Sequence, residues 1–119
     1  MSRLATMQLT PTILLAMMAA FGAADDSFSC QQRHPQYWNA INKFCAKGDI
    51  VVPTNYSEQG KGVNAHRAFI TGNCNPKQWV PSDVCRGQFY SMCIGADNDI
   101  TFRNYGTNNC QRWTLWYKG

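Results

Sequence analysis

The sequence predicts an α+β fold, a small disulfide-stapled domain in which two helices pack on a mainly antiparallel sheet. Three observations predict it. The chain has 119 residues, a length typical of one domain. Its six cysteines are an even number that can staple a small core. Two segments with helical spacing of apolar residues are each followed by strand-like segments, an order typical of helices packed on a sheet.

The first half of the chain predicts one helix and two strands. The helix is expected over 35–47, because Pro35 suits a first helical turn and the following apolar residues recur at helical spacing. These apolar residues are Tyr37, Ile41, Phe44 and Cys45. The β-branched run 50–52 predicts a short strand that stops at Pro53. The polar stretch 55–62 is expected to be a loop, and the alternation over 63–70 predicts a second strand.

The second half predicts the same order of elements. The turn-forming residues over 71–76 precede a helix that opens at Pro81 and Ser82, with Ser82 as its N-cap, and ends near Gly95. Strands are then expected over 100–105 and 111–117, joined by a turn at 106–109.

Residues 1–24 have the order of a secretory signal peptide. Arg3 supplies the positive region, an apolar stretch follows, and small residues end it before Asp25. The apolar stretch, about eleven residues long, is too short for a transmembrane span. We therefore expect cleavage after Ala24, a single cysteine-rich domain over 25–119, and an extracellular location without a transmembrane segment.

The cysteines predict three disulfides. They are Cys30, Cys45, Cys74, Cys85, Cys93 and Cys110. An even number of cysteines in an oxidising compartment is typical of disulfides, but spacing does not select one of the 15 possible pairings. No CxxC spacing is present and the chain has only two histidines, so no metal is expected. Most large cofactor folds do not fit a chain of this length, so no cofactor is expected either.

The sequence offers little for catalysis. A small secreted ribonuclease could use His66 as base, Glu58 as its partner and Arg67 for phosphate. However, His66 and Arg67 are adjacent in a predicted strand, so their side chains should point to opposite faces. The acidic run 97–99 lacks the further ligands of a calcium loop and is interpreted as a turn that ends a helix. No enzymatic activity is therefore expected.

The aromatic residues are more informative. In the last strand, Trp113 should face inward and Trp116 outward, because side chains alternate along a strand. Aromatic rings beside amides and arginines are typical of sugar recognition, since a ring covers the apolar face of a pyranose and amides bind its hydroxyls. The candidate sugar-binding residues are Asn104, Tyr105, Asn108, Asn109, Gln111, Arg112 and Trp116.

Two further features concern the surface. Asn55-Tyr56-Ser57 is a glycosylation sequon, so Asn55 is a candidate acceptor on an exposed segment. The formal net charge is +4, and the basic residues are scattered rather than clustered. A nucleic-acid partner, which usually needs a clustered basic patch, is therefore not expected.

Several motifs carry a resemblance to known proteins. They are Phe44-Cys45, Asn75-Pro76-Lys77-Gln78-Trp79-Val80-Pro81, Cys85, Gln88-Phe89-Tyr90-Ser91-Met92-Cys93, Tyr105-Gly106 and Cys110-Gln111-Arg112-Trp113. With them the chain resembles small cysteine-rich secreted fungal proteins, and is similar to the glycan-binding group typified by a cysteine-rich mushroom protein of the inky-cap kind. The resemblance covers residues 28–117. It implies a compact α/β sandwich with several disulfides and carbohydrate binding without catalysis.

The sequence thus favours a secreted, lectin-like protein that binds a glycan and is not an enzyme. The first alternative is an effector or toxin-like protein that recognises a host protein or a membrane. The second is the small ribonuclease described above.

Overall fold

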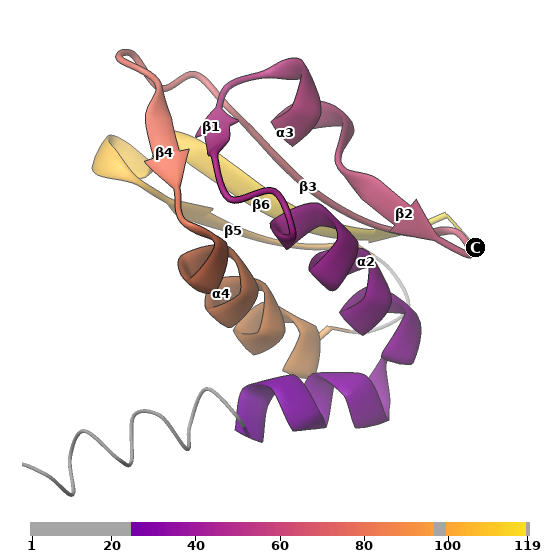
Figure 1. Ribbon diagram of the computed structural model, residues 1–119. Coiled ribbons are helices and arrows are strands. Elements are labelled where there is room, and N and C mark those ends of the chain that lie inside the picture. The colour runs from indigo at the N-terminus through magenta and orange to yellow at the C-terminus, as the bar shows by residue number, and fades with distance from the viewer. Residues whose placement is uncertain (1–24, 97–99, 119) are drawn as a thin grey trace, which may run out of the picture.

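The computed structural model describes residues 25–96 and 100–118, which form a small α+β domain (Figure 1). In chain order the elements are a helical stretch over 25–33, α2 (Pro35–Cys45), β1 (Ile50–Val52), α3 (Asn55–Gln59), β2 (Lys61–Val63), β3 (His66–Gly72), β4 (Gln78–Val80), α4 (Ser82–Ile94), β5 (Thr101–Tyr105), the 3-10 turn η1 (Thr107–Asn109) and β6 (Gln111–Tyr117). The signal peptide expected over 1–24 and the turn expected over 97–99 lie outside the described residues.

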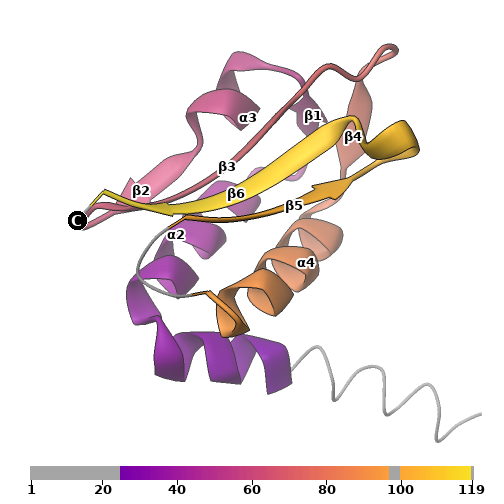
Figure 2. The same ribbon diagram turned by 180° about the vertical axis from the view of Figure 1, so that it is seen from behind.

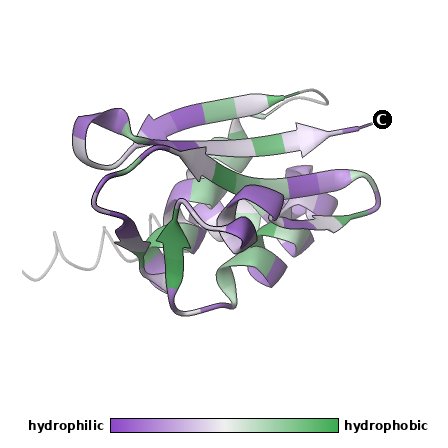
Figure 3. Cartoon of the chain, turned by 90° about the horizontal axis from the view of Figure 1, so that it is seen from above, coloured by the Kyte–Doolittle hydropathy of each residue, from purple (hydrophilic) through white to green (hydrophobic). Residues whose placement is uncertain are grey.

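The helices and the main sheet form two layers. The sheet has four antiparallel strands in the order β2-β3-β6-β5, and β1 pairs with β4 in a separate antiparallel ribbon. Helices α2 and α4 pack side by side on one face of the four-stranded sheet, as the front and back views show (Figures 1 and 2). Figure 3, seen from above, places both helices on the same side of that sheet. The predicted fold class is therefore confirmed.

Strand β6 shows how the sequence creates the two faces. Trp113 and Leu115 point into the helix-covered core and are fully buried, whereas Trp116 points to the opposite face and is 37% exposed. Thr114 shares the face of Trp116 but is only 2% exposed. Its cross-strand neighbours are Phe69 on β3 and Phe102 on β5, which lie on either side of it. The alternation predicted for the last strand is thus confirmed, with one exposed tryptophan on the open face.

Three disulfides cross-link the domain and use all six cysteines. Cys30–Cys93 joins the helical stretch 25–33 to the C-terminal end of α4, and Cys45–Cys85 joins the end of α2 to the start of α4. Cys74–Cys110 joins the loop after β3 to the residue before β6. Two bridges therefore hold the helical layer together, and the third holds the loops at one end of the sheet.

Several predicted elements are confirmed with small shifts of their ends. The strand over 50–52 and the strand over 111–117 have the predicted bounds. The helix predicted over 35–47 has Pro35 in its first turn and ends at Cys45. The strand predicted over 63–70 begins later, at His66, because Asn64 and Ala65 form the turn of a hairpin with both φ angles positive.

The loop predicted over 55–62 is wrong. Residues 55–59 form α3, because Thr54 and Ser57 make a capping box that satisfies the first amide groups of this short helix. Strand β2 then follows and pairs with β3. Asn55, the predicted glycosylation acceptor, is exposed at the start of α3.

Two further elements were not predicted from the sequence, and the N-cap of one helix lies at a different residue than predicted. The helical stretch 25–33 lacks a strong apolar pattern and is tied to the domain by its disulfide and by a 3.1 Å hydrogen bond from Trp38 Nε1 to Ser27 Oγ. Strand β4 has only three residues and exists through its pairing with β1. The N-cap of α4 is Pro81 rather than Ser82, whose hydroxyl donates a 2.6 Å hydrogen bond to Cys45 O.

Candidate functional site

Two hollows flank the loop that joins β5 to β6. The first, which we call the amide hollow, has a volume of about 440 Å³. It is lined by Asn73, Asn75, Pro76, Gln78, Thr107, Asn108 and Cys110. The second, which we call the aromatic hollow, has a volume of about 190 Å³. It is lined by Trp79, Val80, Pro81, Val84, Gln88, Tyr105, Gly106, Gln111 and Trp113. Among the described residues, no charged side chain lines either hollow.

The amide hollow is held open by covalent and backbone geometry. The Cys74–Cys110 disulfide joins its two walls, and Asn73 N donates a 3.1 Å hydrogen bond to Cys110 O. Asn108 adopts a φ of +55°, in the left-handed region that asparagine tolerates better than most residues. An asparagine amide offers two donors and an acceptor, so this wall can bind paired hydroxyl groups.

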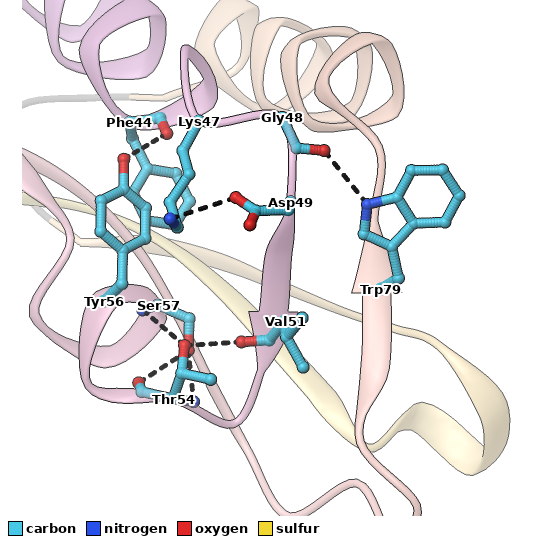
Figure 4. Close-up of polar contacts among 9 residues, drawn as sticks. All are labelled: Phe44, Lys47, Gly48, Asp49, Val51, Thr54, Tyr56, Ser57 and Trp79. Carbon is cyan, nitrogen blue, oxygen red and sulfur yellow. Dashed lines mark hydrogen bonds and ion pairs between the residues drawn. The ribbon is translucent and has the colours of Figure 1, made fainter.

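Trp79 gives the aromatic hollow a rigid and accessible ring. It lies on β4 opposite Val51, and 64% of its surface is exposed. Its Nε1 nevertheless donates a 3.1 Å hydrogen bond to Gly48 O, which holds the indole in one orientation (Figure 4). An exposed ring that is already fixed loses little side-chain entropy when a ligand covers it.

Contacts of residues before and after β1 hold the segment around Gly48 in place. The Lys47 ammonium lies 3.1 Å from Asp49 Oδ1, and the Tyr56 hydroxyl donates a 2.7 Å hydrogen bond to Phe44 O (Figure 4). The Tyr56 ring stacks on the Phe44 ring with centroids 5.3 Å apart. Burial raises the pKa of Tyr56, and the nearby Lys47 ammonium partly opposes this rise. These contacts hold the backbone segment whose Gly48 carbonyl accepts the hydrogen bond from the Trp79 indole.

A chain of amide hydrogen bonds separates the two hollows. Gln111 is only 6% exposed, and its Nε2 donates to Gln78 Oε1 at 2.9 Å. Its Oε1 accepts a 2.8 Å hydrogen bond from Nε1 of the buried Trp113. Gly106 passes close to this chain with a φ of +83°, and an added Cβ there would lie 2.6 Å from Gln78 Oε1. Gln111 therefore positions the wall between the hollows.

Gln88 contributes an amide to the aromatic hollow from α4. Its Oε1 is buried and has no hydrogen-bond partner among the described residues. Tyr105, on the other side of the hollow, packs edge-on against Trp113 with centroids 5.0 Å apart. A ligand in this hollow would thus meet a supported aromatic ring.

The structure divides the seven predicted sugar-binding residues. Tyr105 and Gln111 pair across β5 and β6 and line the aromatic hollow, while Asn108 lines the amide hollow. Asn109 follows in the same turn. Asn104 and Arg112 pair with each other on the open face of the sheet, and the Arg112 guanidinium lies 4.2 Å from the centre of the Phe102 ring.

Trp116 stands apart from the other candidates. It lies four residues beyond Arg112 on β6, about 13 Å away at the rise of an extended strand. Trp116 and the loop-end residues therefore do not form one small-ligand site.

Sequence reasoning missed the residues that complete the two hollows. These are Asn73, Asn75, Gln78, Trp79 and Gln88. Asn73 and Asn75 fall in the turn-forming segment before the second helix, where asparagine is typical of a turn, and Gln78 and Trp79 follow that segment. Alternation of Gln78, Trp79 and Val80 was the available signal, because a strand that buries Val80 must turn Trp79 outward.

The residues of the ribonuclease alternative lie in different surroundings. The His66 ring packs between Tyr37 and Tyr117, with centroids 4.7 and 4.6 Å away, and its Nδ1 lies 2.9 Å from Asn64 O. Arg67 pairs with Trp116 on the other face and donates to Gln59 O. This separation gives the ribonuclease mechanism no support.

Within residues 25–96 and 100–118, no group of three or more His, Cys, Asp or Glu side chains could hold a metal ion. No helix in the same residues is long and apolar enough to cross a membrane. No family model, curated protein or solved structure matches this chain.

Proposed function

We propose that this protein is secreted and binds a glycan without catalysing a reaction, and that the sugar occupies the two hollows beside the 106–110 loop. The observation that carries the proposal is Trp79, an exposed indole held in place by Gly48 O next to amide-lined hollows. A pyranose presents an apolar C–H face for such a ring and hydroxyls for the amides. The site suits neutral sugars, because no charged side chain of the described residues lines either hollow.

Each wall of the site has a distinct part in this mechanism. Trp79 stacks on the apolar face of one sugar unit. Asn73, Asn75 and Asn108 bind hydroxyls in the amide hollow. Gln111 does not bind sugar directly, because both ends of its amide are already engaged.

A glycan array with the oxidised protein is the first experiment, followed by calorimetry with the best neutral oligosaccharide. Trp79→Ala should weaken binding about tenfold, because covering part of an indole contributes about 1.5 kcal/mol. Trp116→Ala is the matched control, since it removes the exposed tryptophan at the other end of the sheet and should leave this binding unchanged.

A second pair of variants tests the amide hollow without disturbing the turn. Asn108 and Asn109 both have positive φ angles, so glycine preserves either backbone conformation. Asn108 lines the hollow and Asn109 does not. Asn108→Gly should weaken binding several-fold, and Asn109→Gly should not.

Clear outcomes would contradict the proposal. A blank array at high protein concentration would refute glycan binding. Hits that survive both Trp79→Ala and Asn108→Gly in folded protein would refute this location. Recognition of a host protein would then be the stronger hypothesis, with partner capture insensitive to free sugars.

A further inference from the structure

A third hollow lies at the opposite end of the sheet from the proposed sugar site. Its volume is about 340 Å³, and it opens between the β2–β3 hairpin and the end of β6. Its lining includes two cationic residues, Arg67 and Lys118, and the aromatic residue Trp116. We call it the hairpin hollow.

Arg67 is fixed in this hollow with donors to spare. Its Nη1 donates a 2.7 Å hydrogen bond to Gln59 O at the end of α3. Gly62 lies beside the guanidinium, and a Cβ added there would be 3.4 Å from Arg67 Nη2. The remaining N–H groups of Arg67 have no partner among the described residues. A guanidinium held by one bond is oriented in advance for an anionic oxygen.

Lys118 brings a second positive charge to the same place. Its backbone N donates a 2.9 Å hydrogen bond to Ala65 O, which attaches the end of β6 to the hairpin turn. Neither Lys118 nor Arg67 has a carboxylate within 4 Å among the described residues, where the ion pair present is Lys47–Asp49. Both charges are therefore available to a ligand.

Trp116 gives the hollow an apolar wall. It pairs with Arg67 across β3 and β6 and keeps 37% of its surface exposed. The Trp116 ring lies beside two cations that have no carboxylate partners. This arrangement complements an anionic group that is bonded to a flat or apolar organic group.

We propose that the hairpin hollow is a second binding site, which takes a phosphate monoester with its oxyanion on Arg67 and Lys118 and the organic group that bears it against Trp116. Two cations favour a tetrahedral oxyanion that carries up to two charges over a singly charged carboxylate. The site is independent of the proposed glycan site, because it shares no residue with the two hollows at the other end.

The experiment follows the four tryptophan indole N–H signals by ¹⁵N NMR while inorganic phosphate, acetate and phenyl phosphate are added in turn. The Trp116 signal, assigned with Trp116→Phe, should shift and the Trp79 signal should not. Inorganic phosphate should bind with a Kd on the order of 1 mM and acetate at least fivefold more weakly. Phenyl phosphate should bind about three- to tenfold more tightly than inorganic phosphate, because its ring covers the indole.

Three variants separate the two parts of the site. Arg67→Gln and Lys118→Gln should each weaken both phosphate and phenyl phosphate about five- to tenfold. Trp116→Leu should remove only the advantage of phenyl phosphate over phosphate, and because it lacks the indole reporter its binding is followed by the backbone amide signal of Lys118. Lys43→Gln, which removes an exposed charge from α2, is the matched control and should change neither.

Several results would overturn this second site. Equal weakening by Lys43→Gln would mean that phosphate responds only to net charge. A shift of Trp79 without a shift of Trp116, or an acetate affinity equal to that of phosphate, would also refute it. None of these outcomes bears on the glycan proposal, which is tested with neutral sugars.

Discussion

Replacement of Gln111 by methionine should strongly destabilise the domain. Gln111→Met keeps the approximate volume of the side chain but removes both of its hydrogen bonds. Loss of the bond to Gln78 Oε1 costs about 1 kcal/mol, as for a typical hydrogen bond. The greater cost arises at Trp113, which is 1% exposed and whose Nε1–H would lose its only acceptor among the described residues. An orphaned buried donor costs roughly 1–3 kcal/mol, so the expected total is roughly 2–4 kcal/mol.

The assay is guanidinium unfolding of the oxidised protein, followed by far-ultraviolet circular dichroism. The same change in a Trp113→Phe background should cost only about 1 kcal/mol, because phenylalanine has no N–H to orphan. Gln31→Met, at an exposed position of the helical stretch 25–33, is the control and should stay within about 0.5 kcal/mol of the parent. A cost for Gln111→Met below about 0.5 kcal/mol, or an equal cost in both backgrounds, would refute the reasoning.

Two other predictions concern the stability of the scaffold. Ala65→Gly should stabilise the protein by about 0.5–1 kcal/mol in the same assay, because alanine is strained at a φ of +71°; Ala46→Gly, at a φ of −64°, should not stabilise it. Tyr56→Phe should cost about 1 kcal/mol at pH 7, because it removes the hydrogen bond to Phe44 O. Since the folded-state pKa of Tyr56 is raised, its contribution is present below pH 10 and lost as the pH rises through that raised pKa, so the gap between parent and variant should narrow there. Stabilities measured between pH 7 and 11 that keep a constant gap would contradict this account.

The sequence predicted the features that depend on local periodicity. The last strand is an example, because alternation alone placed Trp113 inside and Trp116 outside, and the burial of both residues agrees. The start of α2 at Pro35 followed from the fixed φ of proline. The α+β class followed from the order of such segments.

The features that depend on distant partners could not be predicted. Gln111 resembles a surface amide in sequence, yet its position is set by Gln78, 33 residues earlier. The pairing of the cysteines depends on how the helices pack, which spacing does not encode. The alternation around Trp79 spans only three residues, which is too short to predict a strand that exists only through its pairing with β1. Three residues named from the sequence, Tyr105, Asn108 and Gln111, line the two hollows, but the separation of Trp116 from them depends on the strand register.

The Cys74–Cys110 bridge has a consequence for how such a protein can change over generations. It locks the two loop walls at one end of the sheet, while the other two disulfides secure the helices independently. Residues on those walls, such as Asn75 and Asn108, can be exchanged without the walls drifting apart, because their spacing is set by a covalent bond rather than by their own contacts. Selection can thus explore new surface chemistry there at little risk to folding. The same arrangement makes that end of the molecule a suitable place for engineered loop libraries.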